Sequence, residues 1–244
     1  MNFLFYFFFP FIILIFVKKN LYFYFVFIFG HSFFFFLMEE HQLNELDRYD
    51  RQIRAWGFET QQKLHECNFL FFGVNSASLE CMKNLILAGA SEVHITDTDE
   101  NLETYSHHLY FLVALNPYCP TKIIPFSNIC DIDQQKIKTE EIDKYNFICI
   151  FKNEEFFIKQ IASSDKVLLF NHGATGDILY QQPEYDFPLD TIVLTPSQQT
   201  VIGALLSQMI VDHLPPIQTP IHYQLTFDPI QLSSSVKNLL LDVN

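Results

Sequence analysis

The chain has little glycine, no paired cysteines and few basic residues. Its 244 residues include 7 Gly and 5 Cys, and no C-x-x-C pair or His at ligand spacing accompanies the cysteines. This pattern predicts neither a zinc or other metal site nor a disulfide framework, and it favours a reducing compartment. The 15 Lys and Arg against 28 Asp and Glu give a net charge of −13, and the sequence contains no local basic stripe. Nucleic-acid binding is therefore not expected.

Residues 1–37 differ in composition from the rest. They hold 15 of the 28 Phe, they lack Ala, Arg, Asp, Glu, Thr and Gln, and their only charged side chains are Lys18 and Lys19. Hydropathy favours a membrane anchor, but the basic start and small-residue cleavage site of a signal peptide are missing. The favoured residues are those of A/T-rich codons, and Met38 stands where the composition becomes ordinary. We expect translated upstream sequence, with a genuine membrane anchor as the alternative, and take residues 38–244 as one folded domain.

Residues 38–97 predict the first half of an α/β domain. Apolar residues at three- and four-residue steps predict a helix over 43–56, ended by Gly57, and a short second helix over 59–66. The apolar run 68–73 has strand length, Asn75 and Ser76 are good N-caps for a helix that ends at Gly89, and residues 92–97 fit the next strand. This order is a βαβ unit, which implies a parallel sheet.

The second half gives weaker patterns. Further strands are expected at 146–151, 167–171 and, as the last element, 222–227. The apolar stripe of residues 198–214 predicts a long helix before Pro215 and Pro216. Residues 105–115 fit a helix, 137–144 a polar connector, Gly173 with Gly176 a turn, and 183–196 a loop with several prolines. No internal repeat or long linker divides the domain.

The turn after Phe72 is where a nucleotide-binding fold places its phosphate loop. That loop has glycine at its first, third and sixth positions, so that the backbone can approach a pyrophosphate at the helix N-terminus. Here Gly73 is kept, whereas Asn75 and Ser78 occupy the other two positions. Asp97 ends the following strand, where a ribose-binding acid would lie, although acidic residues commonly cap strands. We expect a degenerate loop, a vestigial Asp97 and no cofactor bound by this chain.

The most specific string in the chain is YDRQIRAWG at residues 49–57. Together with KNLILAG at 83–89, ITD at 95–97 and GALLSQMIVDHL at 203–214, it resembles the ThiF/ubiquitin-activating superfamily. Within that superfamily the likeness is to the small, non-thioester-forming subunits of heterodimeric SUMO-activating enzymes. The resemblance covers residues 46–116 and 165–230. It implies a Rossmann-like ThiF/adenylation domain with a mostly parallel sheet, shortened in the middle relative to the family.

The resemblance also implies a division of labour between two chains. The catalytic large subunit would bind ATP and Mg and form a thioester with a ubiquitin-like modifier, and the small subunit would complete the heterodimer, in the nucleus and cytoplasm. The arginine of the D-R-Q string, Arg51 here, is implied to reach the ATP phosphates in the partner. A guanidinium offered to a polyphosphate stabilises developing charge. From spacing alone, Arg51 would instead pair with Asp47 or Asp50 on a solvated helix face.

Three functions stay open at this stage. The first is a non-catalytic regulatory subunit of a SUMO-activating enzyme, without autonomous adenylation or thioester activity; the small polar loop residues 75–78 also suit a neddylation-type subunit. The second is an autonomous nucleotide-dependent enzyme, against which the broken glycine loop and the absence of Arg or Lys just after Asp97 argue. The third is a membrane-anchored interaction domain, which needs residues 1–37 to be genuine. Cys67, Cys81 and Cys149 are expected in the core, and the adjacent His107 and His108 have poor geometry for one metal.

Overall fold

The structure is a computed structural model that describes residues 25–29, 32–36, 45–131, 136–152, 159–161, 164–181 and 193–240. The chain divides into two compact units, residues 1–50 and 51–244. In the first, β1 (Phe25–Phe29) and β2 (Ser32–Phe36) pair as an antiparallel hairpin. No helix in the described ranges is long and apolar enough to cross a membrane. Most of residues 1–37 lie outside those ranges, so both interpretations of that segment stay predictions.

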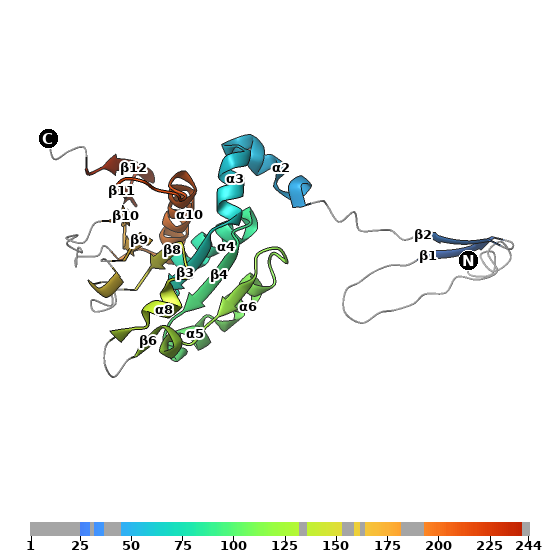
Figure 1. Cartoon of the computed structure of the whole chain (residues 1–244), viewed down its shortest axis with the longest axis horizontal. Helices are drawn as coiled ribbons and strands as arrows, with labels where there is room; N and C mark the ends of the chain where they lie inside the picture. The colour runs from blue at the N-terminus through green and yellow to red at the C-terminus, as the bar shows by residue number, and fades with distance from the viewer. Residues whose placement is uncertain are drawn as a thin grey trace. The chain divides into compact units, whose positions relative to one another are not determined.

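An eight-stranded sheet organises the second unit, in the order β12-β11-β10-β9-β8-β3-β4-β5 (Figure 1). Strands β5, β4, β3, β8 and β9 are parallel to one another, and β10, β11 and β12 continue the sheet antiparallel. The predicted α/β fold with a mostly parallel sheet is confirmed. The strands are β3 (Asn68–Phe72), β4 (Glu92–Thr96), β5 (Thr121–Ile123), β8 (Phe147–Ile150), β9 (Val167–His172), β10 (Thr175–Tyr180), β11 (Ile221–Asp228) and β12 (Ser233–Asn238).

Apolar runs form the central strands because helices and loops cover both faces of the sheet. All four residues of β3 after Asn68 are buried, and so is every residue of β8. On one face, α4 (Ser76–Ala88) and α10 (Pro196–Asp212) pack side by side (Figure 1). A Cβ added at Gly203 of α10 would overlap the carbonyl oxygen of Ala77 in α4. The two helix backbones are therefore in direct contact.

Shorter elements complete the described chain. α2 (Glu45–Trp56) and α3 (Phe58–His65) come before β3, and Gly57 between them has a positive φ of 90°. The second face of the sheet packs against residues of α7 and α8. The remaining elements are α5 (Asp99–Thr104), α6 (Ser106–Val113), α7 (Phe126–Ile129), β6 (Cys130–Asp131), β7 (Lys136–Ile137) and α8 (Thr139–Ile142).

Several predictions for the second half are wrong in detail. Residues 137–144 are not a connector, because they include the end of β7 and the helix α8. Gly176 does not share the turn with Gly173 but lies inside β10, where its missing side chain makes room for Leu206. β11 is not the last element, since β12 follows it. The predicted loop 183–196 lies mostly outside the described residues, and its last residue, Pro196, begins α10.

A buried polar cluster joins the antiparallel strands. The Asp177 carboxylate on β10 is fully buried. It accepts hydrogen bonds from Nε2 of His172 on β9 at 2.8 Å and from Nε2 of His222 on β11 at 2.9 Å. Gln224 on β11 donates a third at 3.1 Å. A buried carboxylate needs such donors, so this cluster ties three neighbouring strands together.

Candidate functional site

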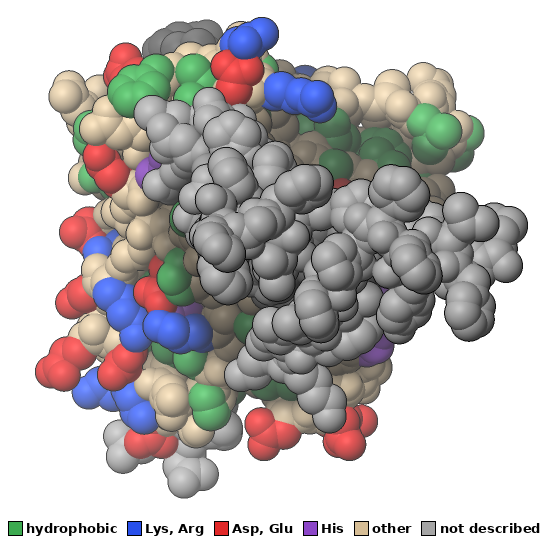
Figure 2. Space-filling model, turned by 90° about the vertical axis from the view of Figure 1, so that its right-hand side faces the viewer, with side chains coloured by type: hydrophobic (Ala, Val, Ile, Leu, Met, Phe, Trp, Pro, Cys, Tyr) green, Lys and Arg blue, Asp and Glu red, His purple; other side chains and the backbone are tan. Residues whose placement is uncertain are grey.

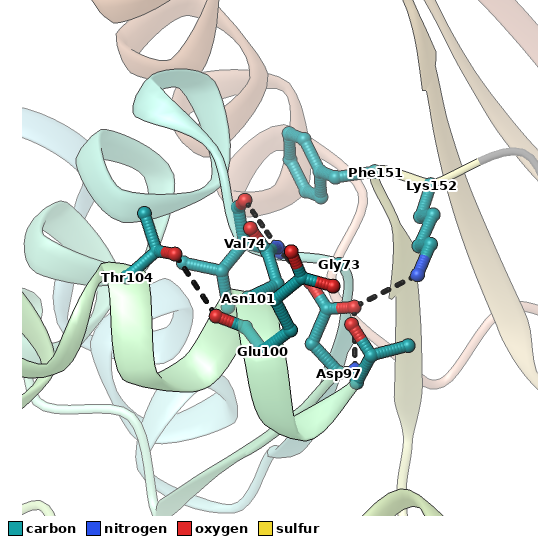
Figure 3. A pocket seen from close by; sticks show the side chains of 9 residues that line it. Gly73, Val74, Asp97, Glu100, Asn101, Thr104, Phe151 and Lys152 are labelled. Carbon is teal, nitrogen blue, oxygen red and sulfur yellow. Dashed lines mark hydrogen bonds and ion pairs between the residues drawn. The ribbon is translucent and has the colours of Figure 1, made fainter.

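The carboxyl ends of β3, β4 and β8 meet at one edge of the sheet and border a cleft of about 370 Å³ (Figure 3). Open parallel sheets bind their ligands at this edge. Of the residues predicted around the degenerate loop, Gly73 and Asp97 line this cleft, whereas Asn75 and Ser78 are not among its lining residues. The lining residues are Gly73, Val74, Asp97, Thr98, Glu100, Asn101, Thr104, Phe151 and Lys152.

Asp97 is fully buried at the back of this cleft, and the chain's own groups surround its carboxylate. Oδ2 accepts hydrogen bonds from the Val74 amide at 2.7 Å and from the Asn101 side-chain amide. Oδ1 accepts from the Thr98 amide at 2.7 Å and pairs with Lys152 Nζ at 3.1 Å. Burial alone raises the pKa of Asp97, but these four donors outweigh burial and hold the pKa below its ordinary value.

These contacts decide what Asp97 can do for a ligand. A carboxylate offers about four lone-pair sites, and four internal donors already use them. A ribose hydroxyl would have to displace one of these donors. The arrangement therefore fits a carboxylate that shapes the turn after β3, and it does not fit one held ready for a ribose.

The N-terminus of α4, where a pyrophosphate would lie, is closed by the chain's own side chains. Asn75 Oδ1 accepts a hydrogen bond from the Ser78 amide at 2.9 Å, and Ser78 Oγ accepts one from the Asn75 amide at 2.8 Å. This is a reciprocal capping box. It occupies backbone donors that a phosphate loop presents to its ligand. The residues at the second and third glycine positions thus do not fit a bound pyrophosphate.

Gly73 is kept for a reason that needs no phosphate. Its φ is +95°, and an added Cβ would lie 2.7 Å from the Cβ of Lys152 and 2.9 Å from the Lys152 backbone nitrogen. The chain after β8 passes directly over the turn, as Figure 3 shows for Phe151 and Lys152. Asn75 Nδ2 also donates to the Phe151 carbonyl at 3.2 Å. Glycine is required here by the close approach of two segments of the chain itself.

Arg51 lies outside this cleft. It is exposed on α2 and is not one of the residues that line the cleft. Within the described ranges no ion pair joins Arg51 to another residue. Its guanidinium is therefore presented to solvent.

The cysteines are unsuited to nucleophilic chemistry in this fold. All five are buried, and none of them is part of a disulfide. Burial raises the pKa of Cys67 and of Cys119 to about 12, and it raises the pKa of Cys81 and Cys149 as well. A thiol with so high a pKa holds almost no thiolate at neutral pH. Among the described residues, no three His, Cys, Asp or Glu side chains are arranged to hold a metal ion.

Six of the nine residues that line the cleft were not predicted from the sequence, and two of these six, Asn101 and Lys152, contact the Asp97 carboxylate through their side chains. Lys152 directly follows β8, and Asn101 lies four residues after Asp97 at the start of α5. Asn101 Nδ2 also donates to the Val74 carbonyl at 2.9 Å, so it links α5 to the turn after β3. The rule that parallel strands share one carboxyl edge could have pointed to Lys152, because a strand was expected at 146–151.

Comparisons with known proteins relate parts of the chain to SUMO activation. No family model matches it. The chain is 43% identical over 49 residues to SUMO-activating enzyme subunit 1 of Dictyostelium discoideum, covering 20% of this chain and 15% of that protein. It is 31% identical over 117 residues to SUMO-activating enzyme subunit 1 of Homo sapiens, covering 46% of this chain and 32% of that protein. It is also 34% identical over 79 residues to DNA damage tolerance protein rad31 of Schizosaccharomyces pombe, covering 32% and 26%.

The chain matches less than a third of the length of each of these relatives. A crystal structure of PaaA matches the fold with a TM-score of 0.55 and 13% identity, over 87% of this chain and 78% of that chain. The predicted resemblance to SUMO-activating enzyme small subunits is confirmed by the sequence matches, and the structural match shows that this chain shares its α/β fold with PaaA.

Proposed function

We propose that this chain is a small subunit of an enzyme that activates a ubiquitin-like modifier of the SUMO type, and that it completes the partner's adenylation site without binding nucleotide itself. The observation that carries the proposal is the closure of the chain's own nucleotide site. The capping box occupies the N-terminus of α4, and internal donors surround Asp97. The similarity to relatives named as subunit 1 supports the same role.

In this proposal the chemistry belongs to the partner. The catalytic large subunit binds ATP and Mg, adenylates the modifier and forms the thioester, in the nucleus and cytoplasm. Arg51 of this chain is exposed, and it reaches the ATP phosphates across the interface. A guanidinium presented there stabilises negative charge that develops at the phosphates, so activity depends on assembly.

The first experiment compares the chain alone with the assembled pair. The full chain and a candidate large subunit are purified together, and modifier-dependent ATP–pyrophosphate exchange is measured. We expect exchange by the pair, and neither exchange nor calorimetrically detectable ATP binding by the isolated chain. ATP binding at the Gly73 turn of the isolated chain would contradict the proposal. Exchange with a neddylation-type modifier in place of SUMO would keep the role and change the modifier.

Substitution of Arg51 tests the in-trans contact directly. Arg51→Ala should lower exchange by the pair by about tenfold to a thousandfold, because a charge contact to the transition state is lost. Co-purification should be unchanged, since Arg51 is exposed in the chain. Arg54→Ala, which removes an exposed arginine from the same helix, is the matched control and should leave exchange near the wild-type rate. Unchanged exchange in Arg51→Ala would refute this role.

A further inference from the structure

We infer that Gln61 is a positioning residue, which fixes the helix that carries Arg51 against the end of α4. This inference rests on the proposed function. Gln61 lies on α3 and is 2% exposed, so its amide is withdrawn from water. A buried amide needs partners for its oxygen and its nitrogen. The partners of the Gln61 amide lie at the ends of α2 and α4.

The Gln61 side chain bridges two helices. Its Oε1 accepts a hydrogen bond from the Trp56 indole nitrogen at 3.1 Å, at the last residue of α2. Its Nε2 donates to the carbonyl of Ala88 at 2.7 Å, at the last residue of α4. That carbonyl is one of the helix-end acceptors that no residue within α4 can satisfy. Nε2 also lies 3.2 Å from His65 Nε2.

α2 also provides a side-chain amide, that of Gln52, which reaches the carbonyl of the residue before Ala88. Gln52 Nε2 lies 3.5 Å from the carbonyl oxygen of Leu87. The last two residues of α4 therefore meet one side-chain amide from α2 and one from α3. The Gln61 bond to Ala88 is the shorter and more buried of the two, so it provides most of the anchorage. Gly57 follows Trp56 at once with a φ of 90°, so the turn into α3 leaves the end of α2 beside Gln61.

The consequence concerns Arg51, which is next to Gln52 and five residues before Trp56 on the same helix. The Gln61 amide carries both an acceptor for the indole N–H and a donor for the Ala88 carbonyl, so one side chain satisfies both groups at the same time. Without it, both partners lose their hydrogen bonds and the end of α2 is free to shift. A displacement of about 1 Å at a catalytic contact can cost up to a hundredfold in rate.

The test uses the full chain in its pair with the large subunit. Gln61→Met keeps the length of the side chain and removes both hydrogen bonds. Trp56→Phe keeps an aromatic ring and removes only the indole donor, so it remains informative if Gln61→Met fails to fold. Gln62→Met is the matched control, because Gln62 is exposed and its side-chain amide donates to the nearby Glu66 carboxylate, at 3.3 Å. Each change is made alone and combined with Arg51→Ala, and kcat and KM for ATP are measured in the exchange assay.

We expect Gln61→Met to lower kcat and kcat/KM by about tenfold with KM for ATP little changed, because Arg51 acts on charge that develops in the transition state, and Trp56→Phe to act in the same direction. In the Arg51→Ala background neither change should lower kcat/KM further, because both act through Arg51. Losses that multiply with Arg51→Ala, a rise in KM with kcat unchanged, or no loss in either variant would overturn the inference while the effect of Arg51→Ala stands. No effect of Arg51→Ala itself would instead remove the proposed function, and this inference with it.

Discussion

At the scale of the single residue, Gly73 and Gly57 share a positive φ but differ in their surroundings. The φ angles are 95° and 90°, and an added Cβ meets Lys152 at Gly73 but nothing within 4 Å at Gly57. Gly73→Ala should therefore lower the free energy of unfolding by about 3 kcal/mol, and Gly57→Ala by about 1 kcal/mol from the backbone alone. Urea denaturation of both variants measures the difference. Equal losses would mean that the segment at Lys152 moves aside without cost.

Asp97 should make the free energy of unfolding depend on pH in the acidic range. Its carboxylate is buried, and the internal donors hold its pKa below the ordinary value. A lowered folded pKa gives stability that is present above the unfolded pKa, about 4, and is lost as the pH falls through the folded pKa. The free energy of unfolding should therefore drop below about pH 4, and the drop should be shallower in Asp97→Asn.

Urea denaturation between pH 3 and pH 7 checks this expectation, with Asp99→Asn as the control because Asp99 is exposed two residues further on. At neutral pH, Asp97→Asn should also lose on the order of 2 kcal/mol, since Lys152 and the Val74 amide lose a charged acceptor. Identical pH profiles for the wild type and Asp97→Asn would show that the pKa of Asp97 is the same in the folded and the unfolded chain.

At the scale of the element, the contact between α4 and α10 depends on Gly203. A Cβ at this position would lie 2.9 Å from the carbonyl carbon of Ala77 and would also overlap its oxygen. Backbone cannot rotate away as a side chain can, so Gly203→Ala should force the helices apart and cost about 3 kcal/mol or more. Thermal and urea denaturation measure this loss. Gln208→Ala, at an exposed position of α10, should stay within about 0.5 kcal/mol of the wild type, and a comparable loss there would point to a general weakness of the helix.

The local patterns within each element explain which elements could be predicted from the sequence. The unit from β3 to β4 was predicted because several local patterns agree: an apolar run, the Asn75 cap, and Gly89 in the left-handed conformation at the end of α4. β12 was missed because Ser233–Asn238 is polar and largely exposed, and it becomes a strand by pairing with β11. Apart from Val236, its own residues do not favour that conformation.

In the candidate site, residues close together in sequence could be predicted, and residues brought together by strand pairing could not. The sequence indicated Gly73, Asn75, Ser78 and Asp97, because they belong to one βαβ unit and lie within 25 residues of one another. Lys152 comes 55 residues after Asp97, and only the pairing of β3 with β8 brings them together. The use of every Asp97 acceptor by internal donors also depends on that pairing, so it could not be predicted from the residues alone.

At the scale of the whole molecule, the acidic composition predicts how the chain meets polyanions. The net charge is −13, and on the face shown in Figure 2 acidic and basic side chains are interspersed over the described surface. A duplex oligonucleotide should therefore show no saturable binding by fluorescence anisotropy at about 150 mM salt. Binding that weakens steeply as salt is added would contradict this expectation, because it would show phosphate contacts with a basic surface.

The capping box of α4 has a consequence for the chain before it meets a partner. Asn75 and Ser78 are three residues apart, so the box forms as soon as the helix does and needs no second polypeptide. In a newly synthesised copy, the capping box would therefore occupy backbone amides at the N-terminus of α4 as soon as the helix forms. If the chain acts in the proposed role, unassembled copies should accumulate without binding ATP, and the nucleotide concentration should not influence their assembly with the proposed large subunit.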